Sequence, residues 1–207
     1  MEIYLVRHGQ TPWNTLRRFQ GSTDIELNEN GRMLAGLTGR GLENVGFDVI
    51  YSSPLMRAYE TACLIRGHRN IRIIRDDRMR EMSFGENEGK MEKDILADSE
   101  NTFRFFFSNP ELYVATGTAE SFEDVIKRSK EFLLDVVNNK EKVELKNNRI
   151  MIVGHGAVNK AIMCNVENRD VKDFWKGDLQ KNCCVTIIDY DESTKEFKVL
   201  KSAVNYA

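Results

Sequence analysis

The sequence predicts an α/β domain with a mainly parallel sheet that ends in an antiparallel edge. Short apolar segments rich in Val and Ile recur along the chain, and helical patterns follow several of them. Strands that alternate with helices are typical of parallel sheets. Towards the C-terminus, residues 183–190 and 197–204 form two strand patterns around a polar turn at residues 191–195. They predict a closing hairpin, which supplies the antiparallel edge.

The first strand and the first helix are predicted near the N-terminus. Residues 3–6 form a short apolar strand pattern. Residues 28–42 have a helical pattern, and Asn28 suits its N-cap position because the side-chain oxygen can accept a hydrogen bond from a free backbone N–H. We expect the apolar side of this helix to carry Leu34, Leu37 and Leu42.

A second strand and a second helix follow. Residues 48–51 form the strand pattern. Ser53 is predicted to cap a helix in which Pro54 is the first residue, because the fixed φ and missing N–H of proline suit that position. This helix runs to Arg66 and places Arg57 in its first turn.

The later elements continue the alternation. Residues 71–74 predict a third strand, and Ser121 with Asp124 resembles a capping box at the start of a long helix. Residues 150–153 predict a buried strand, which leads through a glycine-flanked turn into a short helix with Val158, Ala161 and Ile162 on its apolar side. The helix after the capping box is expected to bury Val125, Ile126, Phe132, Leu133, Val136 and Val137.

The pattern weakens over residues 84–120, which we interpret as an inserted helical lid within a single domain that spans residues 1–207. The run at residues 103–107 contains four phenylalanines without strand alternation. Such side chains can fill the core or face a substrate, and both interpretations stay open for each of them. We find no internal repeat or linker that would mark a domain boundary.

Composition argues against several classes of partner. The chain has 207 residues, of which 41% are hydrophobic and 30% charged, and these values suit one globular domain. No segment approaches the ~18 consecutive apolar residues that a membrane span requires. The net charge of −2 provides no overall attraction to nucleic acid. We expect neither a membrane nor a nucleic acid as a partner.

The N-terminus and the cysteines favour the cytoplasm. The chain starts with strand-like sequence and no basic leader, so no signal peptide is predicted. No C-x-x-C spacing occurs, and we expect reduced thiols at Cys63, Cys164, Cys183 and Cys184. The exposed edge of the terminal hairpin leaves a homodimer open.

Two of the three histidines stand in similar contexts. His8 follows the strand at residues 3–6, His155 follows the strand at residues 150–153, and a glycine comes after each. Ligands of parallel α/β sheets bind beyond the carboxyl ends of the strands, so both imidazoles can meet in one crevice. Either histidine alone would more often be structural, and only their pairing favours catalysis. His68 lies in a polar connection and is not expected to act.

Arg7 and Arg57 supply groups that bind phosphoryl oxygens, because guanidinium binds such oxygens bidentately and stays charged. The same positive charge disfavours protonation of His8, which leaves a neutral imidazole that can attack phosphorus. A departing alkoxide needs a general acid, and Glu81 follows the third predicted strand. Without further context, Glu81 would be assigned to the surface.

At these residues the chain resembles the histidine phosphatase superfamily, also called the phosphoglycerate mutase-like family. The similarity starts at residues 4–14, Tyr-Leu-Val-Arg-His-Gly-Gln-Thr-Pro-Trp-Asn, which resemble the family's L-x-R-H-G-[EQ]-T-x-W-N. It extends in order over nearly the whole chain. The further similar segments are residues 20–21, 27–31, 51–58, 80–89, 120–121, 154–156 and 182–186. The resemblance implies a three-layer sandwich of the phosphoglycerate mutase-like fold.

The resemblance also implies a phosphomonoester hydrolase for a small phosphorylated metabolite, with no metal and no cofactor. It implies that His8 becomes phosphorylated and that Glu81 acts as acid and then as base toward water. Arg7, Arg57 and His155 would hold the phosphoryl oxygens. The resemblance places further phosphate-binding residues at Asn14, Gln20, Gly21 and Gly156.

Two residues depart from the family pattern. Pro12 stands where the family often has an acidic residue, and Gly154 replaces the common serine or alanine before the second histidine. Neither is a reacting group, so catalysis is still expected.

Three other functions stay open. A phosphoglycerate mutase that depends on 2,3-bisphosphoglycerate would use the same residues, although the moderately short segment from Glu81 to His155 favours a phosphatase. A non-catalytic phospho-ligand binder would not need all five of the reacting and binding groups. A metal enzyme with two histidines is disfavoured by the adjoining arginines. The substrate stays open among sugar phosphates, α-ribazole phosphate, phosphoglycerate and phosphoproteins, and we expect residues 84–120 to select it.

Overall fold

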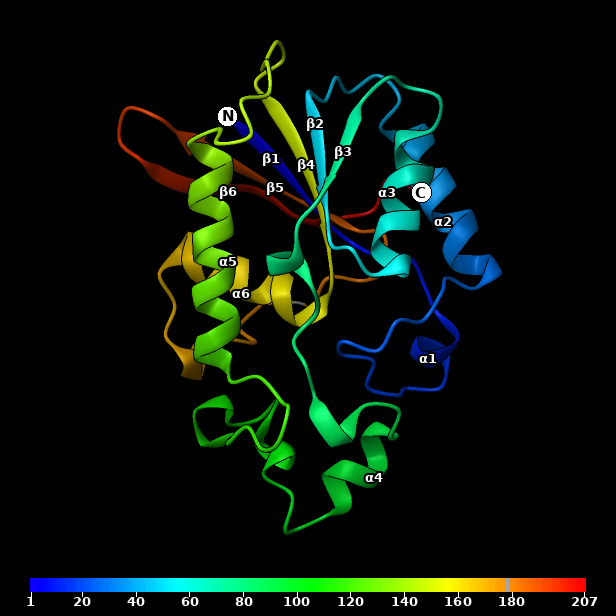
Figure 1. The fold of residues 1–207 in the computed structure, drawn as a ribbon, viewed down its shortest axis with the longest axis vertical. Helices are drawn as coiled ribbons and strands as arrows, with labels where there is room; N and C mark the ends of the chain where they lie inside the picture. The colour runs from blue at the N-terminus through cyan, green and yellow to red at the C-terminus, as the bar shows by residue number, and fades with distance from the viewer. Residues whose placement is uncertain (178) are drawn as a thin grey trace.

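A six-stranded sheet organises the computed structural model, which describes residues 1–177 and 179–207. The strand order is β3-β2-β4-β1-β5-β6 (Figure 1). The first four strands of this order are parallel, and β5 and β6 add the antiparallel edge, as the sequence predicted. The strands are β1 (Glu2–Arg7), β2 (Val49–Ser52), β3 (Arg72–Arg75), β4 (Arg149–Gly154), β5 (Val185–Asp191) and β6 (Glu196–Val204).

Helices cover both faces of the sheet and complete the predicted three layers. α2 (Glu29–Gly41) and α3 (Met56–Arg66) pack on one face, and α5 (Phe122–Val137) and α6 (Gly156–Glu167) pack on the other (Figure 1). Each face has its own apolar cluster, because alternate side chains of the buried strands point to opposite sides. The chain also forms the short helices α1 (Pro12–Thr15) and α4 (Glu92–Ala97).

The capping box predicted for α5 is confirmed. Ser121 Oγ accepts a hydrogen bond from Asp124 N at 3.1 Å, and the Asp124 carboxylate accepts in return from Ser121. The predicted apolar face is buried at Val125, Phe132, Leu133 and Val136, while Ile126 and Val137 are partly buried against the same core.

The predicted apolar side of α2 is wrong at two of its three positions. Leu34 and Leu37 are only half-buried, and the buried face consists of smaller residues, Gly31, Ala35, Thr38 and Gly39. The reason is close packing against α3, since a Cβ on Gly39 would lie 2.9 Å from the Ile65 carbonyl oxygen. Leu42, which ends the helix, is fully buried as expected.

The start of α3 also differs from the prediction. The helix begins at Met56, two residues after Pro54, and Ser53 is not its N-cap. Ser53 N donates to Val153 O of β4 at 3.0 Å, so the chain is still bound to the sheet at this point. The Met56 N–H is satisfied from a distant loop, because it donates to Asp24 Oδ1 at 2.8 Å.

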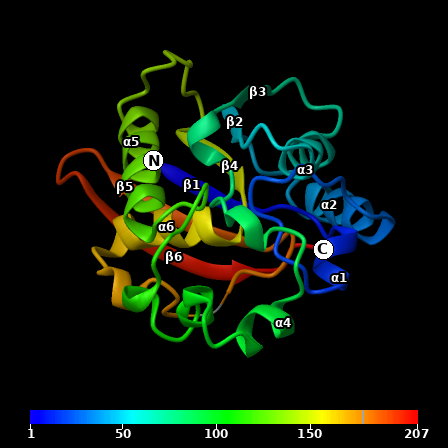
Figure 2. The same cartoon turned by 60° about the horizontal axis from the view of Figure 1, so that its bottom comes forward.

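Residues 84–120 lie beyond the carboxyl ends of the parallel strands (Figures 1 and 2). They fold into α4 and three short 3₁₀ turns, Gly85–Asn87, Thr102–Phe105 and Pro110–Leu112. Phe103 and Phe106 stack with their ring centroids 4.4 Å apart and are buried in the same apolar cluster as α5 and α6. This segment therefore packs onto the main core.

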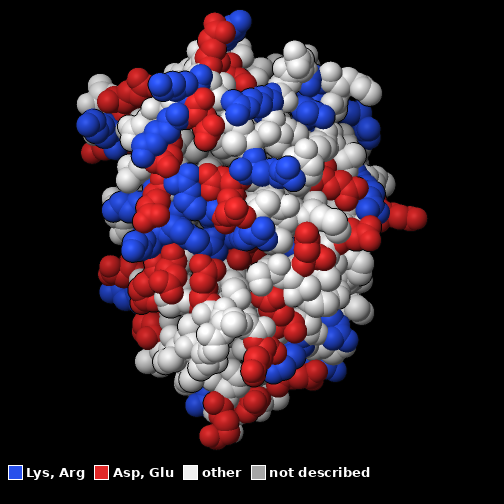
Figure 3. Space-filling view, in the orientation of Figure 1, with Lys and Arg blue, Asp and Glu red and all other residues white. Residues whose placement is uncertain are grey.

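Acidic and basic side chains lie next to one another on one face of the molecule. On the face shown in Figure 3, both signs are interspersed around α5. Their ion pairs include Arg78 with Asp135 at 2.7 Å and Arg128 with Glu120 at 2.6 Å. Within the described residues, no helix combines the length and the hydropathy needed to cross a membrane.

Candidate active site

His8 lies directly after β1, where the chain turns away from the sheet. Its backbone N–H donates to Gly154 O at the end of β4 at 3.0 Å, which holds the two strand ends together. The ring Nδ1 lies 2.6 Å from Gly9 O. Because a carbonyl oxygen can only accept, Nδ1 carries the proton and Nε2 keeps its lone pair. Nε2 is therefore the atom of His8 that can act as a nucleophile.

His155 is the N-cap residue of α6 and lies beside His8. The ring centroids of the two histidines are 5.1 Å apart, so the predicted pairing is present. His155 is fully buried, and neither of its ring nitrogens has a hydrogen-bond partner among the described residues. Because an unpaired buried polar group costs ~1–3 kcal/mol, these nitrogens are suited to bind a ligand that enters the site.

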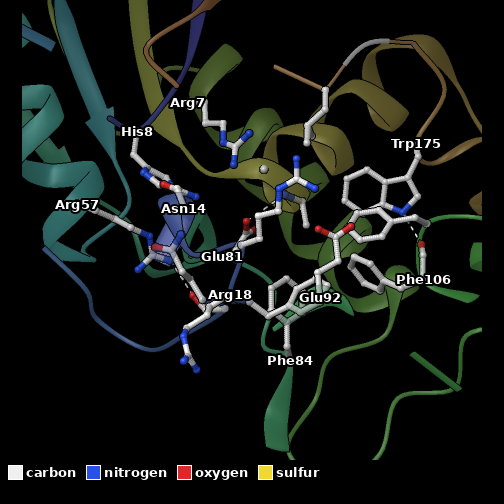
Figure 4. A pocket seen from close by; sticks show the side chains of 18 residues that line it. Arg7, His8, Asn14, Arg18, Arg57, Glu81, Phe84, Glu92, Phe106 and Trp175 are labelled. Carbon is white, nitrogen blue, oxygen red and sulfur yellow. Dashed lines mark hydrogen bonds between the residues drawn. The ribbon is translucent and has the colours of Figure 1, made fainter. Parts of the chain in front are cut away.

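Two arginines, Arg7 and Arg57, lie on the same side of the cavity as His8 and are held by backbone carbonyl groups (Figure 4). Arg57 donates from Nη1 to Thr23 O at 2.8 Å and from Nη2 to Gly21 O at 2.7 Å. Arg7 donates from Nη1 to Gln180 O at 2.8 Å. The Nε atom of each arginine is buried without a partner in the described part of the chain. Both guanidinium groups are thus held in place and still have an N–H for an anion.

Burial and positive charge keep the two histidines neutral. The pKa of His8 is well below its ordinary value of 6.5, chiefly because of burial and then because of Arg57 and Arg7. The pKa of His155 is lowered in the same way, first by burial and then by Arg57. Burial lowers the pKa of Arg57 to about 10, which still leaves it charged at neutral pH. The site is therefore a cationic pocket with neutral imidazoles.

The carboxylate of Glu81 lies against the N-terminal end of α6. Its Oε1 accepts from Met82 N at 2.9 Å and Val158 N at 3.0 Å, and its Oε2 accepts from Ala157 N at 3.1 Å. The N-terminal end of a helix favours a carboxylate at this position. Since each carboxylate oxygen has two lone pairs, Oε2 can still bind a proton on the cavity side.

The remaining predicted residues also line the cavity. Asn14 Oδ1 accepts from Thr11 N at 3.0 Å, and Gln20 Oε1 accepts from Thr11 Oγ1 at 3.0 Å. Because both amide oxygens are engaged, their NH₂ groups are the parts left to bind an anion. Gly21 and Gly156 line the cavity as well and leave room for a ligand.

One cavity of about 220 Å³ is lined by these groups, with the exception of His155, which is fully buried next to it. Arg7, His8 and Arg57 lie on one side of the cavity, and Glu92, Phe106 and Trp175 lie on the other (Figure 4). The sequence did not identify the charged rim of the cavity or three of its apolar lining residues. The rim consists of Arg17, Arg18 and Glu92, and the three apolar residues are Phe19, Trp175 and Leu179. The aromatic wall consists of Phe19, Phe84, Phe106, Phe107 and Trp175.

The family profile of the histidine phosphatase superfamily, branch 1, matches residues 3–203. The chain belongs to this superfamily. This assignment agrees with the resemblance found in the sequence. The fold agrees with the same resemblance, because the mostly parallel sheet and its antiparallel edge match solved structures of phosphoglycerate mutase-like proteins. Similar proteins of this superfamily include phosphatases, and the chain is a phosphatase of the histidine phosphatase superfamily.

Three relatives illustrate the similarity. The chain is 32% identical over 175 residues to phosphoserine phosphatase 1 of Hydrogenobacter thermophilus, covering 84% of this chain and 80% of that protein. The solved structure of Bacillus stearothermophilus YhfR has 35% identity and a TM-score of 0.89, covering 99% and 98% of the two chains. Phosphoserine phosphatase from Entamoeba histolytica, solved with 3-phosphoglyceric acid, has 30% identity and a TM-score of 0.80, covering 97% and 95%.

A buried pair of amides, which the sequence analysis missed, supports the site of this superfamily phosphatase from behind. Gln180 Nε2 donates to Leu5 O and Cys184 O at 2.7 Å each. Gln180 Oε1 accepts from Asn159 Nδ2 at 3.0 Å. The side chain of Gln180 thereby fixes the backbone whose carbonyl oxygen holds Arg7. No sequence motif could have revealed this, because the group that binds the arginine is a main-chain oxygen.

Both departures from the family pattern have a local structural explanation. Pro12 is the first residue of α1, after the N-cap Thr11, where a proline is favoured. A Cβ at Gly154 would lie 2.4 Å from Asn159 Oδ1, so the glycine is required by the neighbouring amide. Neither residue displaces a predicted reacting group.

Proposed function

We propose that this superfamily phosphatase hydrolyses phosphomonoesters of small metabolites through a phosphohistidine formed at Nε2 of His8. The observation that supports this most is the hydrogen bond from His8 Nδ1 to Gly9 O, which leaves the Nε2 lone pair available inside a cationic pocket. The unpartnered N–H groups of Arg7 and Arg57 and the ring of His155 are suited to the phosphoryl oxygens.

In the first step, His8 Nε2 attacks phosphorus and the ester P–O bond breaks. Glu81 gives its proton to the departing alkoxide, so an alcohol leaves and the phosphoryl group stays on His8. Arg7 and Arg57 balance the charge on the transferred oxygens, and the neutral His155 donates a hydrogen bond to them. Such fixed donors stabilise the transition state without reorganisation, and the proposed reaction uses no metal ion or cofactor.

In the second step, a water molecule attacks the phosphohistidine. Glu81, now a carboxylate, takes a proton from this water, and the N–P bond breaks to release inorganic phosphate. His8 and Glu81 return to their starting states. Phosphoserine is one candidate substrate, because similar proteins carry the name phosphoserine phosphatase. The cavity of about 220 Å³ is below the ~300–1,000 Å³ of drug-sized ligand sites and favours a small ester.

The proposal is tested by rapid quenching with phosphomonoesters that carry a radioactive phosphoryl group. We expect label on the wild-type protein that is stable in base and lost in acid, and that maps to His8. The variant His8→Ala should take up no label. His155→Ala is the matched control, since it changes a histidine of the same pocket and should still be labelled at a reduced rate.

Stoichiometric labelling of His8→Ala would refute the phosphohistidine at this position. The fate of the label separates the phosphatase from its main rival. With 3-phosphoglycerate, in the presence and absence of 2,3-bisphosphoglycerate, a phosphatase releases free phosphate. A mutase would instead return the label to an isomer of the substrate.

A further inference from the structure

We propose that the outer part of the cavity is a subsite for a protonated amine, in which the Glu92 carboxylate binds an ammonium group of the substrate. The inference rests on the proposed function, because the phosphate of the same molecule would lie against His8. It defines the substrate class as small phosphomonoesters that also carry an amino group.

Glu92 is held at the cavity by the backbone. It is the first residue of α4, and its N–H donates to Arg17 O at 3.0 Å, which ties the start of the helix to the segment that carries Arg17. The side chain is half-buried, and its carboxylate points into the cavity (Figure 4). Within the described residues, this carboxylate has neither a hydrogen bond nor an ion pair.

A free carboxylate is unexpected in a cavity that binds phosphate. At close range it repels any second anionic group on the ligand, and the repulsion grows in the low dielectric of a partly buried site. The same carboxylate attracts a cation on the ligand, with which it can form a charge-assisted hydrogen bond. Glu92 therefore favours substrates with a positive group at the end away from the phosphate.

The aromatic wall beside Glu92 favours the same ligand. Trp175 Nε1 donates to Phe106 O at 2.6 Å, which fixes the indole ring against the segment that carries α4. Phe106, Phe107 and Trp175 all line the cavity. The faces of aromatic rings attract ammonium groups, especially when these are partly desolvated. The wall thus adds to the attraction exerted by the carboxylate.

Arg17 on the rim is compatible with this assignment. Its side chain lines the cavity, is exposed, and has no hydrogen bond or ion pair within residues 1–177 and 179–207. The Arg17 guanidinium can therefore donate hydrogen bonds to a carboxylate on the same ligand. Phosphorylated amino alcohols and phosphorylated amino acids both fit this scheme, and the amine is the feature common to both.

The test compares two esters of nearly equal shape, O-phosphoethanolamine and n-propyl phosphate, which differ by an ammonium in place of a methyl group. The measured quantity is the ratio of their kcat/KM values. We expect Glu92→Gln to lower this ratio roughly tenfold or more, the size typical of a lost hydrogen bond between charged groups. Each protein sample provides both rates, so partial misfolding cancels.

Asp94→Asn is the matched control. Asp94 lies on the same helix, is exposed and does not line the cavity, so its loss of charge should leave the ratio unchanged. An equal fall in both variants, or a ratio in Glu92→Gln within twofold of the wild type, would refute the subsite. Glu92→Lys should lower the ratio further.

Hydrolysis of p-nitrophenyl phosphate, measured in parallel, separates this inference from the proposed function. Normal hydrolysis with a ratio that does not respond to Glu92 refutes the subsite alone. If the wild-type protein hydrolyses none of the three esters and His8 is never labelled, the proposed function and the subsite are both wrong.

Discussion

Burial determines the protonation of single residues in this site. His8 and His155 are enclosed together with Arg7 and Arg57, and the pKa values of both imidazoles are lowered well below 6.5. The native state therefore resists taking up protons that the unfolded chain accepts. The burial that keeps both imidazoles neutral is therefore also expected to make the protein less stable in acid.

We predict that the free energy of unfolding falls as the pH drops below about 6.5, because the unfolded histidines then bind protons that the native ones do not. Above this pH the two states bind equally few protons at these sites. The variant His155→Gln should show a shallower slope, by as much as about 1.4 kcal/mol per pH unit. Urea unfolding at a series of pH values between 4.5 and 8, measured on ~0.5-unit steps, gives the slopes.

The control is His68→Gln, which removes an exposed histidine outside the site. Its slope should equal that of the wild type. Equal slopes for the wild type and His155→Gln would contradict the assignment of a buried neutral imidazole at position 155.

The sequence could predict which side chains lie together at the candidate site. The turns at His8 and His155 were recognisable because both follow apolar strands, and parallel strands end at the same edge of a sheet. The contact of Arg7 with a main-chain oxygen at Gln180 could not be predicted in this way. Glu92 was also missed, because its position depends on how α4 folds over the cavity and not on a local motif.

At the scale of elements, the junction of β4 and α6 joins several parts of the site. Asn159 Nδ2 donates to Val6 O of β1 at 3.2 Å and to Gln180 Oε1 at 3.0 Å. Its Oδ1 lies so close to Gly154 that a side chain at that position has no room. Because Gly154 has no Cβ, the Asn159 side chain has room to link α6 with β1 and with Gln180.

We predict that Gly154→Ala destabilises the protein by about 1–3 kcal/mol, because the added methyl group would lie 2.4 Å from Asn159 Oδ1. The double variant Gly154→Ala/Asn159→Ala should lose less than the sum of the two single variants, since it removes the clash. Chemical denaturation of the four proteins measures this cycle.

Gly36→Ala is the matched control for this cycle. A Cβ at Gly36 in α2 would have nothing within 4 Å, so alanine should stabilise the helix by about 0.5–1 kcal/mol. Strict additivity of the Gly154 and Asn159 changes would contradict a clash between these two residues.

The elements that the sequence predicted well are those with local signals. The capping box and the apolar period of α5 both lie within the helix and the single residue before it, Ser121. The start of α3 was placed too early because Ser53 is still bound to β4, a partner about a hundred residues away in the sequence. The buried face of α2 was misjudged because small residues, and not leucines, allow the close contact with α3.

At the scale of the whole molecule, residues 84–120 share one apolar cluster with the sheet and with α5. Phe103 and Phe106 belong to the same buried cluster as Phe122, Val125 and Ile152. Because this core is continuous, we expect the segment to unfold together with the rest of the protein.

The two tryptophans allow a test of this expectation. Trp175 is hydrogen-bonded to Phe106 O, and Trp13 lies against Gly89, so the fluorescence of both reports on residues 84–120. We predict that the urea transitions seen by fluorescence and by far-UV circular dichroism coincide. A fluorescence transition at clearly lower urea would show that the segment unfolds on its own.

The pairing of the central strand has a consequence for the protein during its synthesis. β1 leads directly into His8 and pairs with β4, and Glu2 and Arg149 at the start of this pairing are 147 residues apart. On its other side β1 pairs with β5, and Arg7 N donates to Cys184 O. A ribosome-bound chain that lacks these later strands has its first strand unpaired and no His155 beside His8. The candidate site can therefore form only once the chain up to β5 is available to pair with β1.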